Sequence, residues 1–355
     1  MDSETPWSDT DERAFLMKLT HEILTLRTKH PFTIARGGSS EFRVVWVRVT
    51  DSDGNDGWGE ASPSKFYGET ADTVVSVLPR LAAAIEGIDP WSLEEIEHEL
   101  DTAIRFNGAA KSAVSAALHD LAAKRLDVPL WKMWGLDPAR SPRSSFTIGI
   151  GDATDIKRKV AEAEEYPILK VKLGSDHDEE ILDVVRSEAP DKILRVDANA
   201  AWTPKRALHM MNILVRHNVE FVEQPLPAHD IDGLRFVRER SPLPIVADES
   251  CVTSVDIPRL VGAVDGINIK LAKCGGLREA LRMIAVARAH GLLVMCGCMI
   301  ETSLGITAAA HLAPLLDYAD LDGAALVAND PFIGVSIAGG RIALRDAPGL
   351  GVTKA

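Results

Sequence analysis

Charged residues stand near the ends of five consecutive apolar segments of this chain. They are Lys170, Lys172, Asp197, Glu223, Asp248 and Lys270. A buried charge destabilises a protein unless it is paired or coordinates a cation. Three converging carboxylates repel one another, and oxygen ligands with no His or Cys among them suit Mg²⁺ and, less well, Mn²⁺. We therefore predict one Mg²⁺ per subunit on Asp197, Glu223 and Asp248; structural ion pairs to the lysines are the alternative.

The lysines of these segments are placed for proton transfer at carbon. Lys170 and Lys172 are two residues apart, so both side chains lie on one face of a strand. Like charge and a nearby divalent cation lower the pKa of an ammonium group, which lets one lysine act as a base. Lys270 belongs to the sixth strand, which lies opposite the second in an eight-stranded barrel. We predict that one lysine of the Lys170–Lys172 pair and Lys270 exchange a proton between opposite faces of a carbon, while the metal stabilises an enediolate beside a carboxylate or carboxamide.

The spacing of these residues predicts the scaffold. From Lys172 the intervals to Asp197, Glu223, Asp248 and Lys270 are 25, 26, 25 and 22 residues, which is the length of a strand plus a helix. Eight such units close a barrel with its active site at the carboxyl ends of the strands. The expected strands are residues 146–150, 169–173, 194–198, 220–224, 244–248, 266–271, 292–296 and 322–327.

The first third of the chain has a different pattern. Glu41–Thr50 alternates as a strand and Asp51–Gly57 is a cluster of turn residues. Helical periodicity follows between Glu69 and Leu126, with an Ala-rich amphipathic segment at Lys111–Leu121. Strands followed by helices predict a small α+β unit.

Composition excludes several classes of function. Asp and Glu (52) outnumber Lys and Arg (39) to give a net charge of −13, which argues against a nucleic-acid partner. The longest apolar run, residues 291–300, is too short to cross a membrane, and the acidic start is unlike a secretion signal. Four cysteines without a CxxC pair argue against zinc and favour a reduced, cytoplasmic protein.

Taken together, the motifs resemble the muconate-lactonising subgroup of the enolase superfamily. The matching segments are Gly57-Trp-Gly-Glu60, Lys170-Val-Lys172, Asp197-Ala-Asn199, Glu223-Gln-Pro225, Asp248-Glu-Ser250 and Ile269-Lys-Leu-Ala-Lys-Cys-Gly-Gly276. The resemblance implies an α/β fold, a (β/α)7β barrel with an N-terminal α+β capping domain. The expected parts are a disordered tail (1–13), the cap (14–125), the barrel (126–328) and a C-terminal segment that returns to the cap (329–355).

Within the subgroup, Asp320-Leu-Asp322 is similar to the DxD motif of dipeptide epimerases. We expect this motif at the start of the last strand. Two carboxylates on one face suit a substrate ammonium group; an acidic turn is the alternative. The resemblance also implies that Arg36 meets a side-chain carboxylate of the substrate, for which a guanidinium fork is suited, and that Thr147 and Cys298 contact substrate.

Further residues receive supporting roles from the same resemblance. Lys172 and Lys270 are expected to be the catalytic pair, and Lys170 is expected to help neutralise charge on the substrate carboxylate. The loop Ser62–Glu69, with Phe66 and Tyr67, is expected to affect specificity. Asn199, Gln224, Glu249 and Glu301 are expected to support the residues that bind metal or substrate, and Lys273 is expected to be structural.

The resulting hypothesis is a Mg²⁺-dependent isomerase that epimerises dipeptides at the α-carbon of the second residue, with Ala-Glu from murein recycling as the first candidate. Its partner is a small dipeptide, with no nucleic acid or membrane partner, and homo-oligomerisation is left open. The alternatives on the same scaffold are o-succinylbenzoate synthase, N-acylamino-acid racemase and muconate cycloisomerase. A non-catalytic ligand-binding protein is a further alternative.

Overall fold

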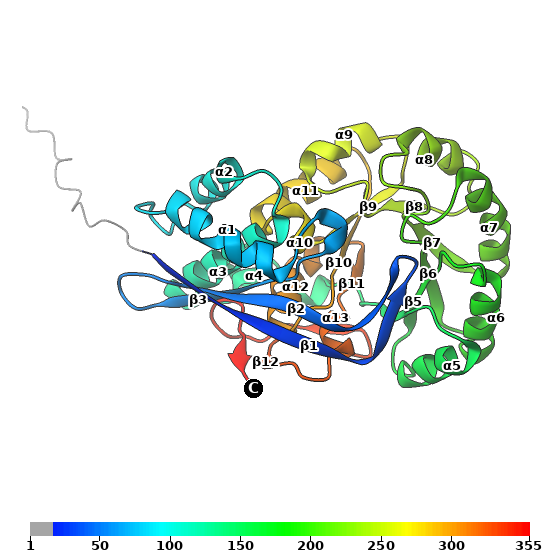
Figure 1. Cartoon of the computed structure of the whole chain (residues 1–355), viewed down its shortest axis with the longest axis horizontal. Coiled ribbons are helices and arrows are strands. Elements are labelled where there is room, and N and C mark those ends of the chain that lie inside the picture. The colour runs from blue at the N-terminus through cyan, green and yellow to red at the C-terminus, as the bar shows by residue number, and fades with distance from the viewer. Residues whose placement is uncertain (1–16) are drawn as a thin grey trace, which may run out of the picture.

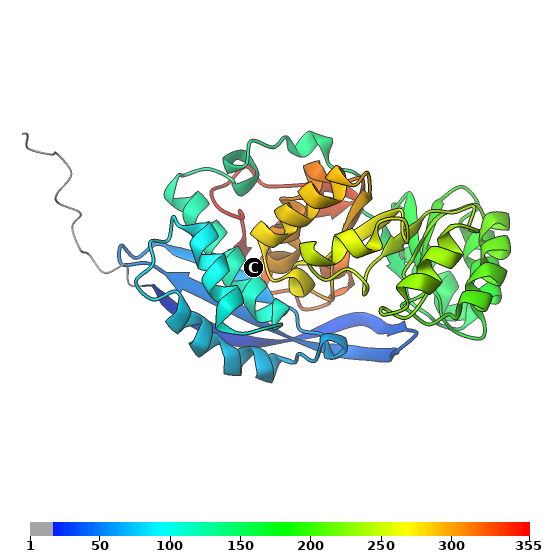
Figure 2. The same cartoon turned by 90° about the horizontal axis from the view of Figure 1, so that it is seen from above.

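The computed structural model describes residues 17–355, in which a small α+β layer lies along one side of a barrel (Figure 1; Figure 2). The layer contains an antiparallel sheet in which β1 (Lys18–Ile34) pairs with β2 (Gly37–Thr50) and β2 pairs with β3 (Asp56–Ala61). The alternating sequence of β2 places Val45 and Val49 in a core beneath the helices. The tail expected at residues 1–13 lies outside the described residues.

Three helices cover this sheet: α1 (Ala71–Ala84), α2 (Leu93–Ala103) and α3 (Gly108–Arg125). Helix α3 packs against β3 at the Gly-Trp-Gly-Glu motif. A Cβ at Gly57 or Gly59 would overlap backbone oxygens of α3. The two glycines therefore permit the close approach of helix and strand that the motif requires.

Eight parallel strands form the barrel in chain order, with β4 and β11 at its two ends. They are β4 (Phe146–Ile148), β5 (Ile168–Lys172), β6 (Ile193–Asp197), β7 (Val219–Glu223), β8 (Ile245–Ala247), β9 (Gly266–Ile269), β10 (Leu293–Gly297) and β11 (Tyr318–Asp320). Ser144 forms an isolated parallel bridge to Ala319, which joins the two ends. The predicted barrel with a capping layer is thereby confirmed.

Helices alternate with these strands around the outside of the barrel (Figure 1). They are α4 (Leu130–Met133), α5 (Ala153–Glu162), α6 (Asp178–Glu188), α7 (Pro204–Arg216), α8 (Ile231–Arg238), α9 (Ile257–Leu260), α10 (Leu271–Cys274), α11 (Leu277–Ala289), α12 (Ser303–Ala310) and α13 (Gly323–Leu326). Short 3₁₀ turns are η1 (Lys65–Tyr67), η2 (Pro138–Arg140), η3 (Ser254–Asp256) and η4 (Ala313–Leu315).

The position of the last strand was predicted wrongly. Residues 322–327 were expected to form it, but the strand is β11 (Tyr318–Asp320) and the apolar Gly-Ala-Ala-Leu run that follows forms α13. Asp322 occupies the position before the helix, where Asp is favoured. Asp320 and Asp322 consequently lie at the carboxyl end of the strand, on the same side of the barrel as the other charged residues.

Successive side chains of a strand point to opposite faces, so every second residue points into the barrel. These inward side chains form a layer beneath the charged residues. Arg195 of β6 lies beside the rings of Phe221 and Tyr318, at 5.3 and 4.7 Å from their centres, and the two rings contact each other with centres 4.9 Å apart. Arg195 Nε donates to Glu220 at 2.7 Å. This layer closes the barrel below the site.

The C-terminal segment contains β12 (Phe332–Ile333), β13 (Ser336–Ala338), β14 (Arg341–Ala343) and β15 (Thr353–Lys354). Phe332 packs edge-on against Trp46 of β2, with ring centres 5.5 Å apart, so the segment touches the capping layer. The exact domain limits, at residues 125 and 328, stay a prediction. Across residues 17–355 no helix is both long and apolar enough to traverse a bilayer.

Candidate active site

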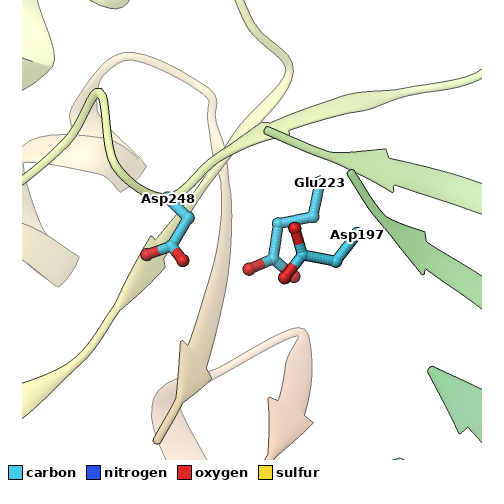
Figure 3. Close-up of side chains that lie close together, drawn as sticks. All are labelled: Asp197, Glu223 and Asp248. Atoms are coloured by element: carbon cyan, nitrogen blue, oxygen red, sulfur yellow. The ribbon is translucent and has the colours of Figure 1, made fainter. Parts of the chain in front are cut away.

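Three buried carboxylates converge at the carboxyl ends of neighbouring strands. Asp197 ends β6, Glu223 ends β7 and Asp248 directly follows β8. One oxygen from each lies within 4.8 Å of the others, and Figure 3 shows the three side chains directed into one space from adjacent strands. The carboxylates predicted to bind a metal are thus brought together.

Each of these carboxylates contacts a lysine. Lys172 Nζ donates to Asp197 Oδ2 at 2.6 Å, and Lys270 Nζ donates to Asp248 Oδ2 at 2.7 Å. Lys172 ends β5 and Lys270 follows β9, and three strands separate β5 from β9 in the barrel. The two ammonium groups therefore flank the carboxylate cluster from opposite sides, as expected.

Lys170 is completely buried and connects two parts of the site. Its Nζ lies 2.6 Å from Glu223 Oε2 and 3.5 Å from Asp197 Oδ2, and donates to Asp320 Oδ2 at 2.8 Å. This ammonium group joins the three-carboxylate cluster to the Asp320-Leu-Asp322 motif.

The pKa values reflect this density of charge. Burial alone would lower the pKa of Lys170, but Asp320, Glu223 and Asp197 raise it well above its ordinary value. The pKa of Lys270 is raised in the same way by Asp248 and Glu223. The protein's own groups therefore act against the lowered lysine pKa expected from the sequence, which assumed a divalent cation among the carboxylates.

Among the carboxyl groups, burial and the neighbouring Asp197 raise the pKa of Glu223 to about 7. Burial also opposes ionisation of Asp197, but Lys172 and Lys170 lower its pKa to about 2. The cluster therefore combines groups whose pKa values are displaced in opposite directions.

Unpartnered oxygen atoms test whether the cluster fits a divalent cation. Within residues 17–355, Glu223 Oε2 is buried and accepts no aligned hydrogen bond, although the Lys170 ammonium lies 2.6 Å away. Asn199 Oδ1 and Asn268 Oδ1 are also buried without a donor from this part of the chain. Hard, buried oxygen acceptors around three carboxylates suit Mg²⁺, so the residues fit the predicted ion.

Neighbouring side chains hold the carboxylates in place. Gln224 Oε1 accepts hydrogen bonds from the backbone N–H groups of Asp248 and Ser250. Asn268 Nδ2 donates to Glu223 Oε1 at 2.8 Å. Gln224 was predicted to have a supporting role, whereas Asn268 was not. The signal for Asn268 is a polar residue inside the apolar strand β9 (Gly266–Ile269).

Lys273 is also buried, and its contacts are more extensive than expected. Its Nζ donates to Asp248 Oδ1 at 2.5 Å and to the backbone oxygens of Asp248, Cys251 and Asn268. It ties the residues that follow β8 to the end of β9, in agreement with the structural role expected of it.

Asp320 and Asp322 extend the site toward β4. Asp320 Oδ1 accepts from Ser145 Oγ at 2.6 Å. Asp322 Oδ2 accepts from the Thr147 backbone N–H at 2.6 Å, and burial together with Asp320 raises the pKa of Asp322 to about 7. Cys298 Sγ lies 3.3 Å from the Asp320 carbonyl oxygen. Four predicted substrate contacts, Thr147, Cys298, Asp320 and Asp322, are therefore adjacent; Ser145 was missed.

Arg36 reaches the mouth of the barrel from the turn between β1 and β2. Its Nη1 donates to the Asn199 carbonyl oxygen at 2.7 Å and lies 2.8 Å from Glu249 Oε1. The guanidinium also stacks 4.5 Å from the centre of the Phe66 ring. Burial, Asp248 and Glu249 raise the pKa of the Tyr67 phenol. The expected specificity loop thus adjoins the mouth, and Arg36 is paired with Glu249.

Comparisons with known proteins agree with this arrangement. Residues 18–135 match the mandelate racemase/muconate lactonizing enzyme N-terminal domain, and residues 153–354 match the enolase C-terminal domain-like family. L-Ala-D/L-Glu epimerase from Bacteroides thetaiotaomicron is 42% identical over 95% of this chain and 88% of its own length.

Two solved structures extend the comparison. A dipeptide epimerase from Cytophaga hutchinsonii, complexed with Mg and D-Ala-L-Val, has a TM-score of 0.92 and 30% identity and covers 96% of both chains. One from Enterococcus faecalis, complexed with Mg and L-Leu-L-Tyr, has a TM-score of 0.90 and 34% identity, with coverage of 94% of this chain and 98% of its own.

Proposed function

Because the chain belongs to the mandelate racemase/muconate lactonizing enzyme family, and within it to the dipeptide epimerases, we propose that it epimerises dipeptides at the α-carbon of the second residue with Mg²⁺ as cofactor. One observation carries the proposal. Lys172 and Lys270 contact the Asp197–Glu223–Asp248 cluster from opposite sides, while Asp320 and Asp322 lie beyond Lys170.

The proposed chemistry is a two-base proton transfer. The neutral form of either Lys172 or Lys270 takes the α-proton, and the electron pair of the broken C–H bond passes into the adjacent carboxylate. The ammonium form of the other lysine then gives a proton to the opposite face of the carbon, so protons and charge balance over the cycle. Mg²⁺ bound by Asp197, Glu223 and Asp248 would supply Lewis acidity that stabilises negative charge on that carboxylate. Lys170 would add a fixed positive charge beside it.

The remaining predicted residues would hold the dipeptide. Asp320 and Asp322 would accept hydrogen bonds from the substrate ammonium group, and the Thr147 contact to Asp322 orients one of these acceptors. Cys298 would contact the substrate beside them. This requirement for an ammonium group separates the proposal from N-acylamino-acid racemisation and succinylbenzoate synthesis.

The proposal is tested with paired substrates. With Mg²⁺, L-Ala-L-Glu should give L-Ala-D-Glu, followed by chiral chromatography, whereas N-acetyl-L-Ala-L-Glu should react at least about 100-fold more slowly, because buried acceptors lose a charged partner. Preference for the acetylated substrate would reject dipeptide epimerisation in favour of N-acylamino-acid racemisation. Absence of reaction with any of a panel of dipeptides would reject the proposed function.

We also propose that the second residue of the dipeptide is acidic and that Arg36 binds its side-chain carboxylate. The Arg36 side chain is 35% exposed, which leaves room for a second carboxylate beside Glu249. Arg36→Ala should lower kcat/KM for L-Ala-L-Glu by about 10- to 100-fold, while L-Ala-L-Ala should change by no more than about threefold. Arg43→Ala, which removes an exposed ion pair to Asp72, is the matched control. If the ratio of the kcat/KM values for the two substrates is the same in Arg36→Ala as in wild type, the assignment is contradicted.

The setting of the reaction is a further part of the proposal. All four cysteines are free thiols, which supports a reducing, cytoplasmic compartment. An Ala-Glu dipeptide would connect the enzyme to murein peptide metabolism. Homo-oligomerisation stays a prediction.

A further inference from the structure

A second pair of acidic residues is buried where the capping layer meets the barrel, away from the three-carboxylate cluster. Glu60 is near the end of β3, and Glu301 is in the loop between β10 and α12. Both are at least 93% buried, with 7% and 6% of their surface exposed. Glu60 belongs to the Gly57-Trp-Gly-Glu60 motif and Glu301 was predicted to have a supporting role, but the proposed mechanism uses neither of them.

The two carboxyl groups approach each other at Gly305 of α12. A Cβ at this position would lie 2.6 Å from Glu301 Oε2 and 3.1 Å from Glu60 Oε1. Both residues also line a cavity of about 10 Å³, together with Ser62 and Ser112. That volume is close to the minimum for one water molecule, and the lining offers polar partners for it.

The hydrogen bonds of the pair hold the loop that follows β10. Glu60 Oε1 accepts from the Thr302 backbone N–H at 2.9 Å, and Glu60 Oε2 accepts from the Thr302 hydroxyl. Glu301 Oε1 accepts from the Met299 backbone N–H at 2.8 Å. The same loop carries Cys298, which contacts Asp320, so the pair fixes one wall of the proposed substrate site.

The charges around the pair do not neutralise two carboxylates. Within residues 17–355 neither Glu60 nor Glu301 forms an ion pair with Lys or Arg. The negative charges of Glu301 and Asp330 raise the pKa of Glu60, and the positive charge of Lys270 lowers that of Glu301 without offsetting the effect of burial. Helices α3 and α12 contribute Ser112, Ala116, Gly305 and Ala308 to the surroundings, none of which is charged. Two like charges in such a place require a compensating proton.

We propose that Glu60 and Glu301 are positioning residues that share a proton and thereby hold the Cys298–Thr302 loop against the capping layer. The shared proton passes directly between the carboxyl groups or through one water in the small cavity. Loss of this proton leaves two buried negative charges side by side and weakens the attachment of the loop.

The direction of the pH dependence follows from the two groups. Burial and Glu301 raise the pKa of Glu60 from 4.5 to about 8, and burial raises that of Glu301 to about 7. A carboxyl group with a raised pKa in the folded state contributes its full stability below the unfolded value of 4.5. That contribution is lost as the pH rises through the folded pKa. The pair should therefore destabilise the protein increasingly from about pH 4.5 to about pH 8, a range that includes most of the interval between pH 6 and pH 9.

A thermal double-mutant cycle at pH 6 and pH 9 tests the proposal. At pH 9, Glu60→Gln and Glu301→Gln should each raise the Tm by about 2 °C or more, and the double variant should gain little beyond either one. At pH 6 this gain should be smaller than at pH 9, because the folded wild type still holds the protons there. The Tm of Glu60→Gln should consequently fall less between pH 6 and pH 9 than that of the wild type.

Glu97→Gln is the matched control, because Glu97 is also buried with a pKa raised to about 7 but faces Ser115, Arg278 and Arg282 rather than a second carboxylate. Its effect on Tm should add to that of Glu301→Gln at both pH values. The proposal of a shared proton would be overturned if the effects of Glu60→Gln and Glu301→Gln on the Tm add at pH 9. It would also be overturned if the Tm of Glu60→Gln and that of wild type change in parallel with pH. If Glu60→Gln fails to fold, the comparison of Glu301→Gln with wild type decides the same question.

A kinetic measurement tests the positioning role. The KM for L-Ala-L-Glu should rise between pH 7 and pH 9 at least about threefold more in wild type than in Glu60→Gln, while kcat changes equally in both. An equal rise of KM in both proteins would contradict positioning of the loop. Because the thermal cycle requires no turnover, it reports on the pair even where the proposed dipeptide activity fails.

Discussion

Replacing either Lys172 or Lys270 with Ala should lower kcat/KM for L-Ala-L-Glu by about 10³-fold or more, since a positioned acid or base contributes about 10²- to 10⁴-fold and each lysine serves as both. The two variants should also differ in the epimer on which they act. Each variant retains one of the two catalytic lysines, so each should still exchange the α-proton of one epimer with D₂O without forming the other epimer. The epimer that exchanges assigns each lysine to a face of the α-carbon.

Lys157→Ala, which removes an exposed ion pair to Glu188, provides the control and should retain wild-type kinetics. Exchange of both epimers by a single lysine variant would contradict a two-base mechanism. Full epimerisation by Lys172→Ala would remove Lys172 from the reaction.

Glu223→Gln should reduce the affinity for Mg²⁺ by more than the roughly 10- to 100-fold that outer partners of metal ligands contribute. The substitution keeps the shape of the side chain but removes one of three converging negative charges. In wild type, Mg²⁺ at a hundredfold excess over its Kd should stabilise the fold by about 2.7 kcal/mol. In Glu223→Gln this stabilisation should nearly disappear, which calorimetric titration and thermal unfolding with and without Mg²⁺ can measure.

Glu179→Gln is the matched control, because Glu179 is half exposed and, among residues 17–355, forms its one ion pair with the surface residue Arg216. It should leave both the Mg²⁺ affinity and the Mg²⁺-dependent stabilisation unchanged. Equal Mg²⁺ binding by Glu223→Gln and wild type would exclude Glu223 as a ligand and return the carboxylates to the role of structural ion pairs.

The barrel and the convergence of its charges could be predicted because both follow from local pattern. Strand alternation and a spacing near 25 residues place Lys172, Asp197, Glu223 and Asp248 at equivalent ends of adjacent strands. The structure reproduces that convergence, with Lys270 on the opposite side.

The last strand could not be located from the same pattern. Its three residues, Tyr318–Asp320, are fewer than the apolar run that follows, so the run 322–327 gave the stronger strand signal. Its Ala and Leu residues equally suit a helix, and short apolar runs do not distinguish the two by periodicity. The error had moved Asp320 and Asp322 to the wrong end of the barrel in the prediction.

Contacts between segments that are far apart in the sequence could not be predicted from the sequence pattern either. Glu60 meets Thr302 and Glu301 across 241 or more residues, and Arg36 pairs with Glu249 through the packing of the β1–β2 hairpin on the barrel. Neither contact has a periodic signal, because each depends on how the capping layer sits against the barrel. The raised pKa of Lys170 likewise depends on Asp320, whose proximity follows only from closure of the barrel.

The most direct test of the account is incubation of the wild-type protein with Mg²⁺ and L-Ala-L-Glu in D₂O, followed by NMR and mass spectrometry. We predict that one deuterium enters the α-carbon of the second residue as the D-epimer forms, with no deuterium at the first residue. Epimer formation with the original hydrogen fully retained would contradict exchange through two lysines. Deuterium at the first residue would place the reacting carbon at the other end of the dipeptide and contradict the assigned roles of Asp320 and Asp322.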